Sequence, residues 1–142
     1  MEDNRFVVGL GEVHRDKFYK NGKTSRKRRS LGGLFALWAS TQTDSFKAVA
    51  AASPSVWIHG WLPFARKHVP MADAVYLSLG DQEEHVKNQA IARVGDNLRA
   101  QHELQQRQLG PERCALVWEE GNHFSDNEDR LARAFAWCMA RL

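Results

Sequence analysis

Three kinds of residue with complementary chemistry occur in order along the chain: a serine (Ser30), a cluster of acids (Asp81, Glu83 and Glu84) and a histidine (His123). A serine hydroxyl is a poor nucleophile unless a histidine takes its proton, and a carboxylate then fixes the imidazole tautomer and stabilises its cation. The acids follow Gly80, and His123 stands two places after Gly121. The order serine, acid, histidine is one that acyl-transfer sites use. The three kinds of residue therefore indicate nucleophilic attack on a carbonyl carbon.

The elements that must position these residues are short apolar strands separated by helices. Runs that are almost wholly apolar favour buried strands of a parallel sheet with helices on both faces. Polar clusters follow the second and third runs, and the carboxyl ends of parallel strands are where such sites form. We predict an α/β fold with parallel strands at Lys47–Ala52, Ala74–Leu79 and Cys114–Glu119, and with helices at Leu31–Ser40, Ile91–Leu109 and Leu131–Leu142.

The residues around Ser30 favour a sharp strand-to-helix turn that presents a nucleophile. Gly32, two places after the serine, would let the following helix pack closely, and the backbone N–H of Leu31 would donate to the developing oxyanion. The pattern G-x-S-x-G also needs glycine two places before the serine, where this chain has Arg28. A serine that caps the following helix is the alternative interpretation of Ser30.

Four stretches of the chain resemble the esterase branch of the α/β-hydrolases, which includes the enterochelin and siderophore esterases. They are SLGGLFALW, AASPSVWIHGW, VYLSLGDQEEHVKN and WEEGNHFSDNEDRLARAFAW. The resemblance extends from Ser30 to Leu142 and implies Ser30 as nucleophile, His123 as base and a small-molecule ester as substrate, without a cofactor. Glu83 best matches the spacing of the acid, with Asp81 and Glu84 as rivals.

The chain departs from that family before Ser30. Eight Lys or Arg and one acid lie between Arg15 and Arg29, where an apolar strand is expected. Burial of such a run in a sheet would cost more free energy, through desolvation of its charges, than the hydrogen bonds of a strand could return. We therefore expect the C-terminal half of a hydrolase at residues 30–142, without its N-terminal strands, joined to a basic head at residues 1–29 that is disordered or not native-like. An exposed sheet edge would then favour self-association.

Two other functions stay open beside the ester hydrolase. A chain that lacks the strand before Ser30 could be a catalytically inactive remnant. The basic head could bind phosphates or nucleic acid, although no nucleic-acid-binding motif surrounds it and a solvated tail is the commoner fate of such a run. Some site residues also have structural alternatives. His123 could be a turn histidine, and Glu83 could be a solvated acid. Trp57 and Trp61, which follow Ser-Pro-Ser, are expected either to line a pocket for an acyl or aryl group of the substrate or to form the edge of the core.

Composition excludes several other classes of protein. The hydrophobic content of 43% and the charged content of 26% are ordinary for a globular chain. No apolar run reaches the roughly 18 residues of a membrane span, and the N-terminus does not have the pattern of a signal peptide. Cys114 and Cys138 are expected to be buried, reduced thiols of a cytoplasmic protein. The histidines show no metal-ligand spacing, so no metal site is expected.

Overall fold

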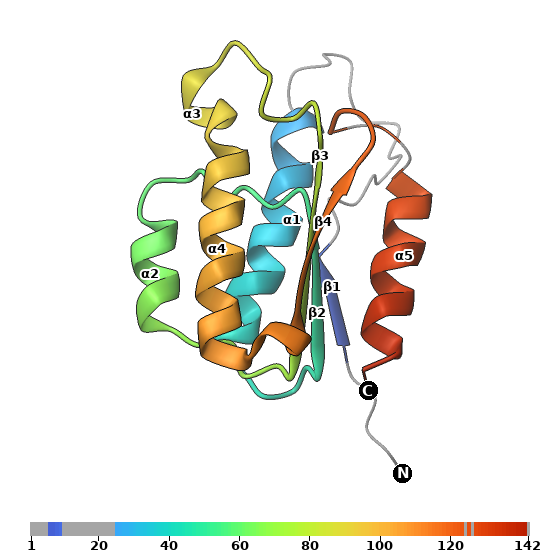
Figure 1. The fold of residues 1–142 in the computed structure, drawn as a ribbon. Coiled ribbons are helices and arrows are strands. Elements are labelled where there is room, and N and C mark those ends of the chain that lie inside the picture. Colours follow the sequence, from blue (N-terminus) through green and yellow to red (C-terminus); the bar gives the residue numbers. More distant parts are fainter. Residues whose placement is uncertain (1–5, 10–24, 124, 126, 142) are drawn as a thin grey trace.

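The computed structural model describes residues 6–9, 25–123, 125 and 127–141, and describes no side chain for residues 6–9, 25–30 and 127. This part of the chain forms four strands and five α-helices, and a short 3-10 helix at Pro111–Arg113 precedes the last strand (Figure 1). Their bounds are β1 (Phe6–Gly9), α1 (Ser25–Ser40), β2 (Ala48–Ala52), α2 (Trp61–Lys67), β3 (Ala74–Gly80), α3 (Gln89–Ala92), α4 (Val94–Leu109), β4 (Cys114–Glu119) and α5 (Asn127–Met139).

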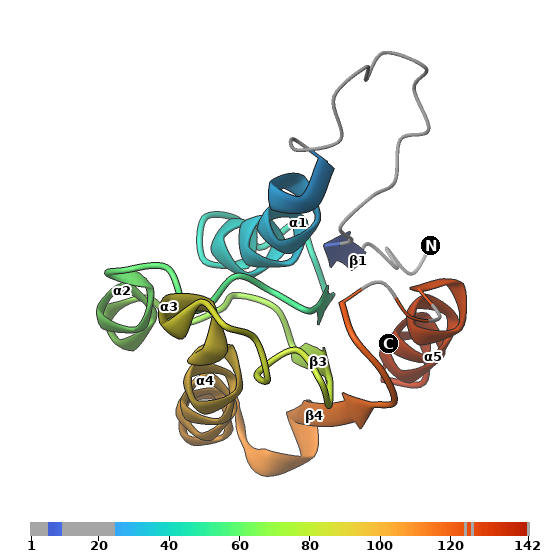
Figure 2. The same ribbon diagram turned by 90° about the horizontal axis from the view of Figure 1, so that it is seen from above.

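The strands form one sheet in the order β1-β2-β3-β4, and every neighbouring pair is parallel. Helices α1, α2 and α4 cover one face of the sheet and α5 covers the other, as the view from above shows (Figure 2). All seven residues of β3 are buried because the strand is central and covered on both faces. The predicted α/β class, with a parallel sheet and flanking helices, is confirmed, and so are the three predicted strands.

The core has two parts, one on each face of the sheet. The larger part lies under α1, α2 and α4, where Leu37, Leu77 and Leu98 are fully buried. The smaller part lies under α5, where Ala134 and Cys138 pack against Tyr76. Helix α1 reaches the sheet closely because Gly33 lacks a side chain. A Cβ there would lie 3.1 Å from the carbonyl oxygen of Ala52.

The structure corrects the predicted boundary at residue 30. Phe6–Gly9, within the segment expected to be a disordered head, forms a strand that pairs with β2. Helix α1 begins at Ser25, so the last cations of the basic run are helical. Arginine and lysine are good helix formers, and the apolar helix that follows extends through them. The remainder of the predicted head, residues 1–5 and 10–24, lies outside the described residues.

Both cysteines are buried and free, as predicted. Burial raises the pKa of the Cys114 thiol to about 11, with the charge of Glu112 adding to the rise, and burial likewise raises that of Cys138 to about 11. Both thiols therefore stay protonated at neutral pH. None of the helices in the described ranges is long and apolar enough to cross a membrane.

Candidate active site

Glu83 lies in the turn directly after the central strand β3, at the carboxyl edge of the sheet. The turn closes tightly, with the N–H of Glu83 donating to the carbonyl oxygen of Gly80 at 3.0 Å. Only glycine fits at position 80. A Cβ there would overlap the carbonyl oxygen of Gly121 and would lie 2.7 Å from Nη2 of Arg130. The turn therefore brings the Glu83 carboxylate next to the loop that follows β4, which carries Gly121 and His123.

The two oxygens of the Glu83 carboxylate have separate partners. Oε1 accepts from Oγ of Ser53 at 2.6 Å, from the N–H of Gly80 at 2.8 Å and from Nη1 of Arg130 at 3.3 Å. Oε2 lies 2.7 Å from Nδ1 of His123. Because three donors hold Oε1, the carboxylate cannot rotate without breaking them, and Oε2 stays directed at the imidazole.

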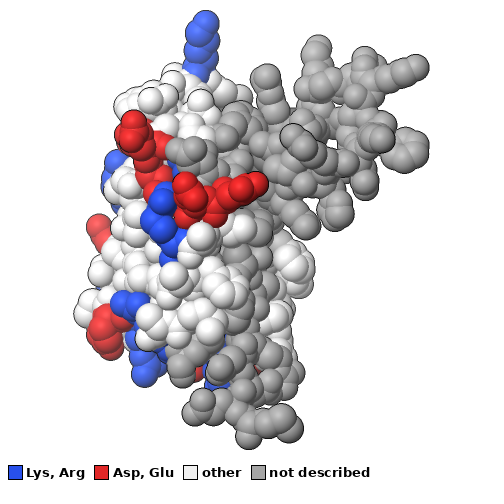
Figure 3. All heavy atoms as spheres, turned by 90° about the vertical axis from the view of Figure 1, so that its right-hand side faces the viewer, with Lys and Arg blue, Asp and Glu red and all other residues white. Residues whose placement is uncertain are grey.

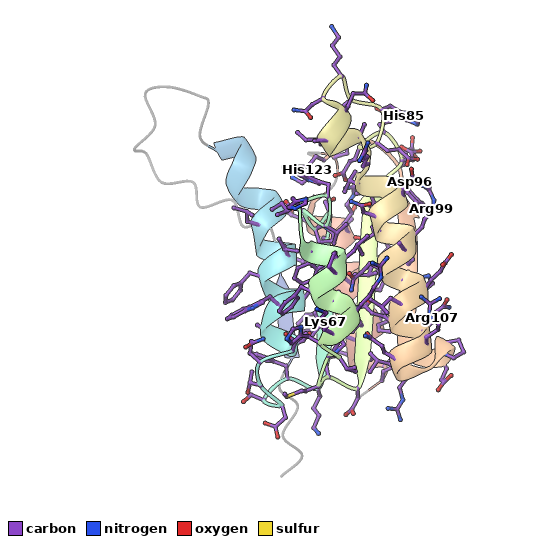
Figure 4. The ribbon with its side chains drawn as sticks, turned by 90° about the vertical axis from the view of Figure 1, so that its left-hand side faces the viewer. Lys67, His85, Asp96, Arg99, Arg107 and His123 are labelled. Carbon is purple, nitrogen blue, oxygen red and sulfur yellow. The ribbon has the colours of Figure 1, made fainter. Side chains whose placement is uncertain are left out.

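His123 belongs to the loop between β4 and α5. Gly121, the second residue of this loop, has a φ of +103°, a left-handed conformation that glycine adopts without strain. Its N–H donates to Oδ1 of Asp81 at 2.9 Å, and the N–H of Asn122 donates to Oγ of Ser125 at 3.1 Å. Figure 4 shows the His123 ring at the upper end of the sheet, where β3 and β4 end.

The contact with Glu83 determines how His123 could act in catalysis. An ionised carboxylate only accepts hydrogen bonds, so Nδ1 carries the imidazole proton and Nε2 is the basic nitrogen. The side chain of His123 is 20% exposed, so the ring lies at the protein surface while its carboxylate partner is buried. A histidine in this arrangement can take a proton from a hydroxyl group and keep its orientation.

Glu83 is ionised in the folded protein. Burial raises the pKa of this carboxyl, but the hydrogen bonds and the charge of His123, with the hydrogen bonds of Ser53 and Gly80, lower it by more, so the pKa lies below its usual value. Arg130, itself 3% exposed, adds a buried positive charge beside Oε1. The negative charge that would stabilise an imidazolium ion is therefore present at neutral pH.

The lowered pKa of Glu83 predicts how stability depends on pH. The folded protein holds this proton less tightly than the unfolded chain, whose glutamate pKa is about 4.3. The stabilisation is therefore fully present above that pKa and is lost as pH falls through the folded pKa. We expect the free energy of unfolding to fall between about pH 5 and pH 2 and the fall to be smaller in Glu83→Gln. Urea denaturation over this pH range measures the free energy of unfolding of both proteins. If it fell equally steeply with pH in Glu83→Gln and in the unmodified protein, the prediction would be contradicted.

Asp81 and Glu84, the two alternative candidates for the acid, contact other residues. Asp81 is exposed and accepts from the backbone of Gly121, so it holds the loop that carries His123. Glu84 pairs with Arg99 of α4 at 3.2 Å, on the side of the molecule shown in Figure 4. Glu83 is thus the acid that contacts the imidazole, while its catalytic role stays a prediction.

Ser30 lies inside α1, because the helix begins five residues before it. Its side chain is outside the described part of the structure, so the expected approach of Ser30 to His123 stays a prediction. The position of Leu31 departs from the elbow geometry. As the seventh residue of α1, Leu31 has its N–H within the intrahelical hydrogen-bond ladder, whereas only the first four N–H groups of a helix are left without such a partner. An oxyanion donor is not available there in this conformation.

The two tryptophans expected near the substrate have different surroundings. Trp57 is half-buried and packs against the larger core, so its role in a substrate pocket stays a prediction. Trp61 is buried, and its Nε1 donates to Oε1 of Gln101 at 2.8 Å, which makes it a core residue. In the part of the chain that the structure describes, no group of three or more His, Cys, Asp or Glu side chains could hold a metal ion.

Sequence reasoning missed two residues that hold the acid, Ser53 and Arg130. Ser53 follows β2 directly and has a φ of +47°, which is rare for a residue with a side chain and places it beside Glu83. Its position after a strand, at the same edge as the other polar clusters, could have identified it. Arg130 comes from α5 on the far face, and no local pattern marks it.

Comparison with known proteins supports this geometry at the level of the fold. No protein-family model matches the sequence, and no curated protein sequence matches it. Among solved structures, the chain is similar to the siderophore hydrolase EstB from Aspergillus nidulans, with a TM-score of 0.61 and 25% sequence identity. The fold resembles part of an esterase. The match covers 77% of this chain and 45% of the EstB chain, so this chain spans less than half the length of that enzyme.

Proposed function

We propose that the chain carries a serine-hydrolase site for carboxylic esters, with Ser30 as nucleophile, His123 as general base and Glu83 as the acid that orients the histidine. The observation that carries this proposal is the Glu83–His123 contact at 2.7 Å, at the carboxyl edge of a parallel sheet. The resemblance to EstB supports it. Because EstB is named as a siderophore hydrolase, siderophore-type esters are the substrate class to examine first.

The proposed reaction passes through an acyl-enzyme. Oγ of Ser30 attacks the ester carbonyl carbon while Nε2 of His123 takes the hydroxyl proton. The ester C–O bond then breaks, and the imidazolium gives that proton to the departing alcohol. Water, deprotonated by the same nitrogen, attacks the acyl-serine, and the serine regains its proton as the carboxylic acid leaves. Ionised Glu83 stabilises the imidazolium in both halves of the cycle.

We expect slow catalysis from this chain. The N–H of Leu31 is engaged inside α1, and the loss of one oxyanion donor typically costs about 10²–10³ in turnover. A displaced nucleophile adds to that loss. The edges of the described sheet, β1 and β4, favour self-association. Rates should therefore be measured on a monodisperse fraction.

The test is hydrolysis of p-nitrophenyl butyrate by the 142-residue chain and by Ser30→Ala. We expect a weak rate from the unmodified chain, below that of complete esterases, and no rate above background from Ser30→Ala. The matched control is Ser45→Ala, which should keep the full rate. Ser45 is an exposed serine in the loop between α1 and β2, where its hydroxyl lies 2.8 Å from that of Thr43. Equal rates from Ser30→Ala and the unmodified chain would contradict the proposal and favour an inactive remnant.

Nucleic-acid binding by the basic head gains no support from the described residues. Four of the eight cations of the run fall in residues 15–24, outside the described residues, and no side chain is described for the other four. On the α5 side of the molecule, acidic and basic side chains lie next to each other in the described surface (Figure 3), and Arg133 pairs with Glu119 at 2.6 Å. A surface of mixed charge does not attract a phosphate backbone. Ester hydrolysis is therefore the function that we propose.

A further inference from the structure

The connection between β1 and α1 is unusually long for its place in the fold. Strand-to-helix connections in α/β units commonly have two to six residues. Here residues 10–24 separate Gly9 from Ser25, and Ser30 is five residues further on. Four of the eight cations between Arg15 and Arg29 fall within residues 10–24, and the other four lie in the part of α1 that precedes Ser30. The basic stretch therefore spans both the long connection and the first turns of α1, and it separates the apolar β1 from the apolar part of α1 that follows Ser30.

The two ends of this connection are already in position for a short turn. Gly9 pairs with Ala51, one residue before the end of β2. Gly33 of α1 packs against the carbonyl oxygen of Ala52 and against Pro54, beyond the same end of β2. Helix α1 begins at the end of the molecule where the parallel strands finish (Figure 1). The end of β1 and the part of α1 near Ser30 thus both lie beside the carboxyl end of β2.

We propose that residues 11–29 are an insertion that splits a nucleophile elbow, an inference that rests on the proposed function. Joined without them, the chain runs Phe6-Val7-Val8-Gly9-Leu10-Ser30-Leu31-Gly32, in which Gly9, Ser30 and Gly32 complete the pattern G-x-S-x-G. The apolar strand that should precede the nucleophile is then β1. The glycine that the strained turn requires two places before the serine is Gly9, in place of Arg28.

The insertion also explains why the N–H of Leu31 is held in the hydrogen-bond ladder of α1 and cannot donate to an oxyanion. In the present helix, six residues precede Leu31 and its N–H lies in the hydrogen-bond ladder. In the joined chain, α1 would begin next to Ser30, so the N–H of Leu31 would be among the first four of the helix, which have no intrahelical partner. That N–H would then donate to the tetrahedral oxyanion, and Ser30 would sit at the turn. Recovery of one donor predicts a rise in Ser30 reactivity of about 10²-fold.

The test compares two deletions in the full chain that differ by one residue. Deletion of 11–29 places one residue between Gly9 and Ser30, whereas deletion of 10–29 joins them directly and puts the turn out of register. Each variant is incubated with a fluorophosphonate probe, whose phosphorus bonds to the serine Oγ as fluoride leaves. The labelling rate at Ser30 and the melting temperature are measured for both variants and for the unmodified chain. A Ser30→Ala version of the first deletion gives the background.

We expect deletion of 11–29 to melt at the same temperature as the unmodified chain or higher and to label at Ser30 about 10²-fold faster. Deletion of 10–29 should melt lower and should label no faster than the unmodified chain. The 11–29 deletion could melt at a higher temperature than the 10–29 deletion and still not be labelled at Ser30. That result would support the insertion but would overturn the proposed hydrolase function. Loss of cooperative unfolding in the 11–29 deletion, or equal melting and labelling of the two deletions, would overturn the insertion itself.

Discussion

Replacement of Glu83 by glutamine is expected to lower the free energy of unfolding by about 3–5 kcal/mol at neutral pH, because removal of one partner from a buried ion pair leaves the other charge uncompensated. The charge left behind is that of Arg130, which is 3% exposed and lies 3.3 Å from the carboxylate. Because glutamine has almost the same shape as glutamate, the decrease in the free energy of unfolding would result from the lost charge and not from a change in side-chain volume. Urea denaturation followed by circular dichroism measures it.

The matched control is Glu84→Gln, the same substitution one residue further on. Glu84 pairs with Arg99, whose side chain is 45% exposed, and exposed ion pairs contribute about 0–1 kcal/mol. The double variant Glu83→Gln/Arg130→Met should recover part of the loss, because it removes both buried charges. If Glu83→Gln were no more costly than Glu84→Gln, Glu83 would not be the acid that the buried network holds.

His123→Gln is expected to slow fluorophosphonate labelling of Ser30 by about 10²–10⁴-fold, the usual contribution of a general base. Stability should change little, because the ring is partly exposed and its removal leaves the three donors to Oε1 of Glu83 in place. Labelling and thermal unfolding of the same preparation separate the two effects. A large change in melting temperature with unchanged labelling would assign His123 a structural role.

His85→Gln is the control for this variant. His85 is an exposed histidine at the same end of the molecule (Figure 4), and it follows Glu83 in the same loop. Its substitution should leave the labelling rate of Ser30 unchanged. A loss of similar size in both variants would show that the rate depends on the fold of this end of the molecule and not on a base at position 123.

The strands of the sheet could be predicted from the sequence because strands that are buried on both faces consist almost wholly of apolar residues. β3 is wholly buried, so its residues are almost all apolar, and the same holds for β2. Helix α2 was missed because it has seven residues and contains Pro63, which reads as a turn signal. β1 was missed because it has only four residues, which the basic run that follows made look like part of a head outside the fold, and its place in the sheet depends on pairing with β2.

The acid and the histidine were predictable for a topological reason. Neighbouring parallel strands end at one edge of a sheet, so polar residues that follow β3 and β4 must come together there. The spacing Gly-x-x-Glu then favours Glu83 over its neighbours. Arg130 could not be found in this way, because its approach to Glu83 depends on how α5 packs across the opposite face. Leu31 was assigned as a donor because the helix was predicted to start at Leu31, directly after Ser30, whereas in the structure it starts at Ser25.

The most direct test of the central claim, a serine-hydrolase site built on Ser30, is to locate a covalent adduct on the unmodified chain. The protein is incubated with diisopropyl fluorophosphate and digested, and the modified peptide is sequenced by mass spectrometry. The proposed function predicts one adduct per chain, on Ser30, and a large decrease of that adduct in His123→Gln. No adduct after prolonged incubation, or an adduct on another serine such as Ser53, would contradict it.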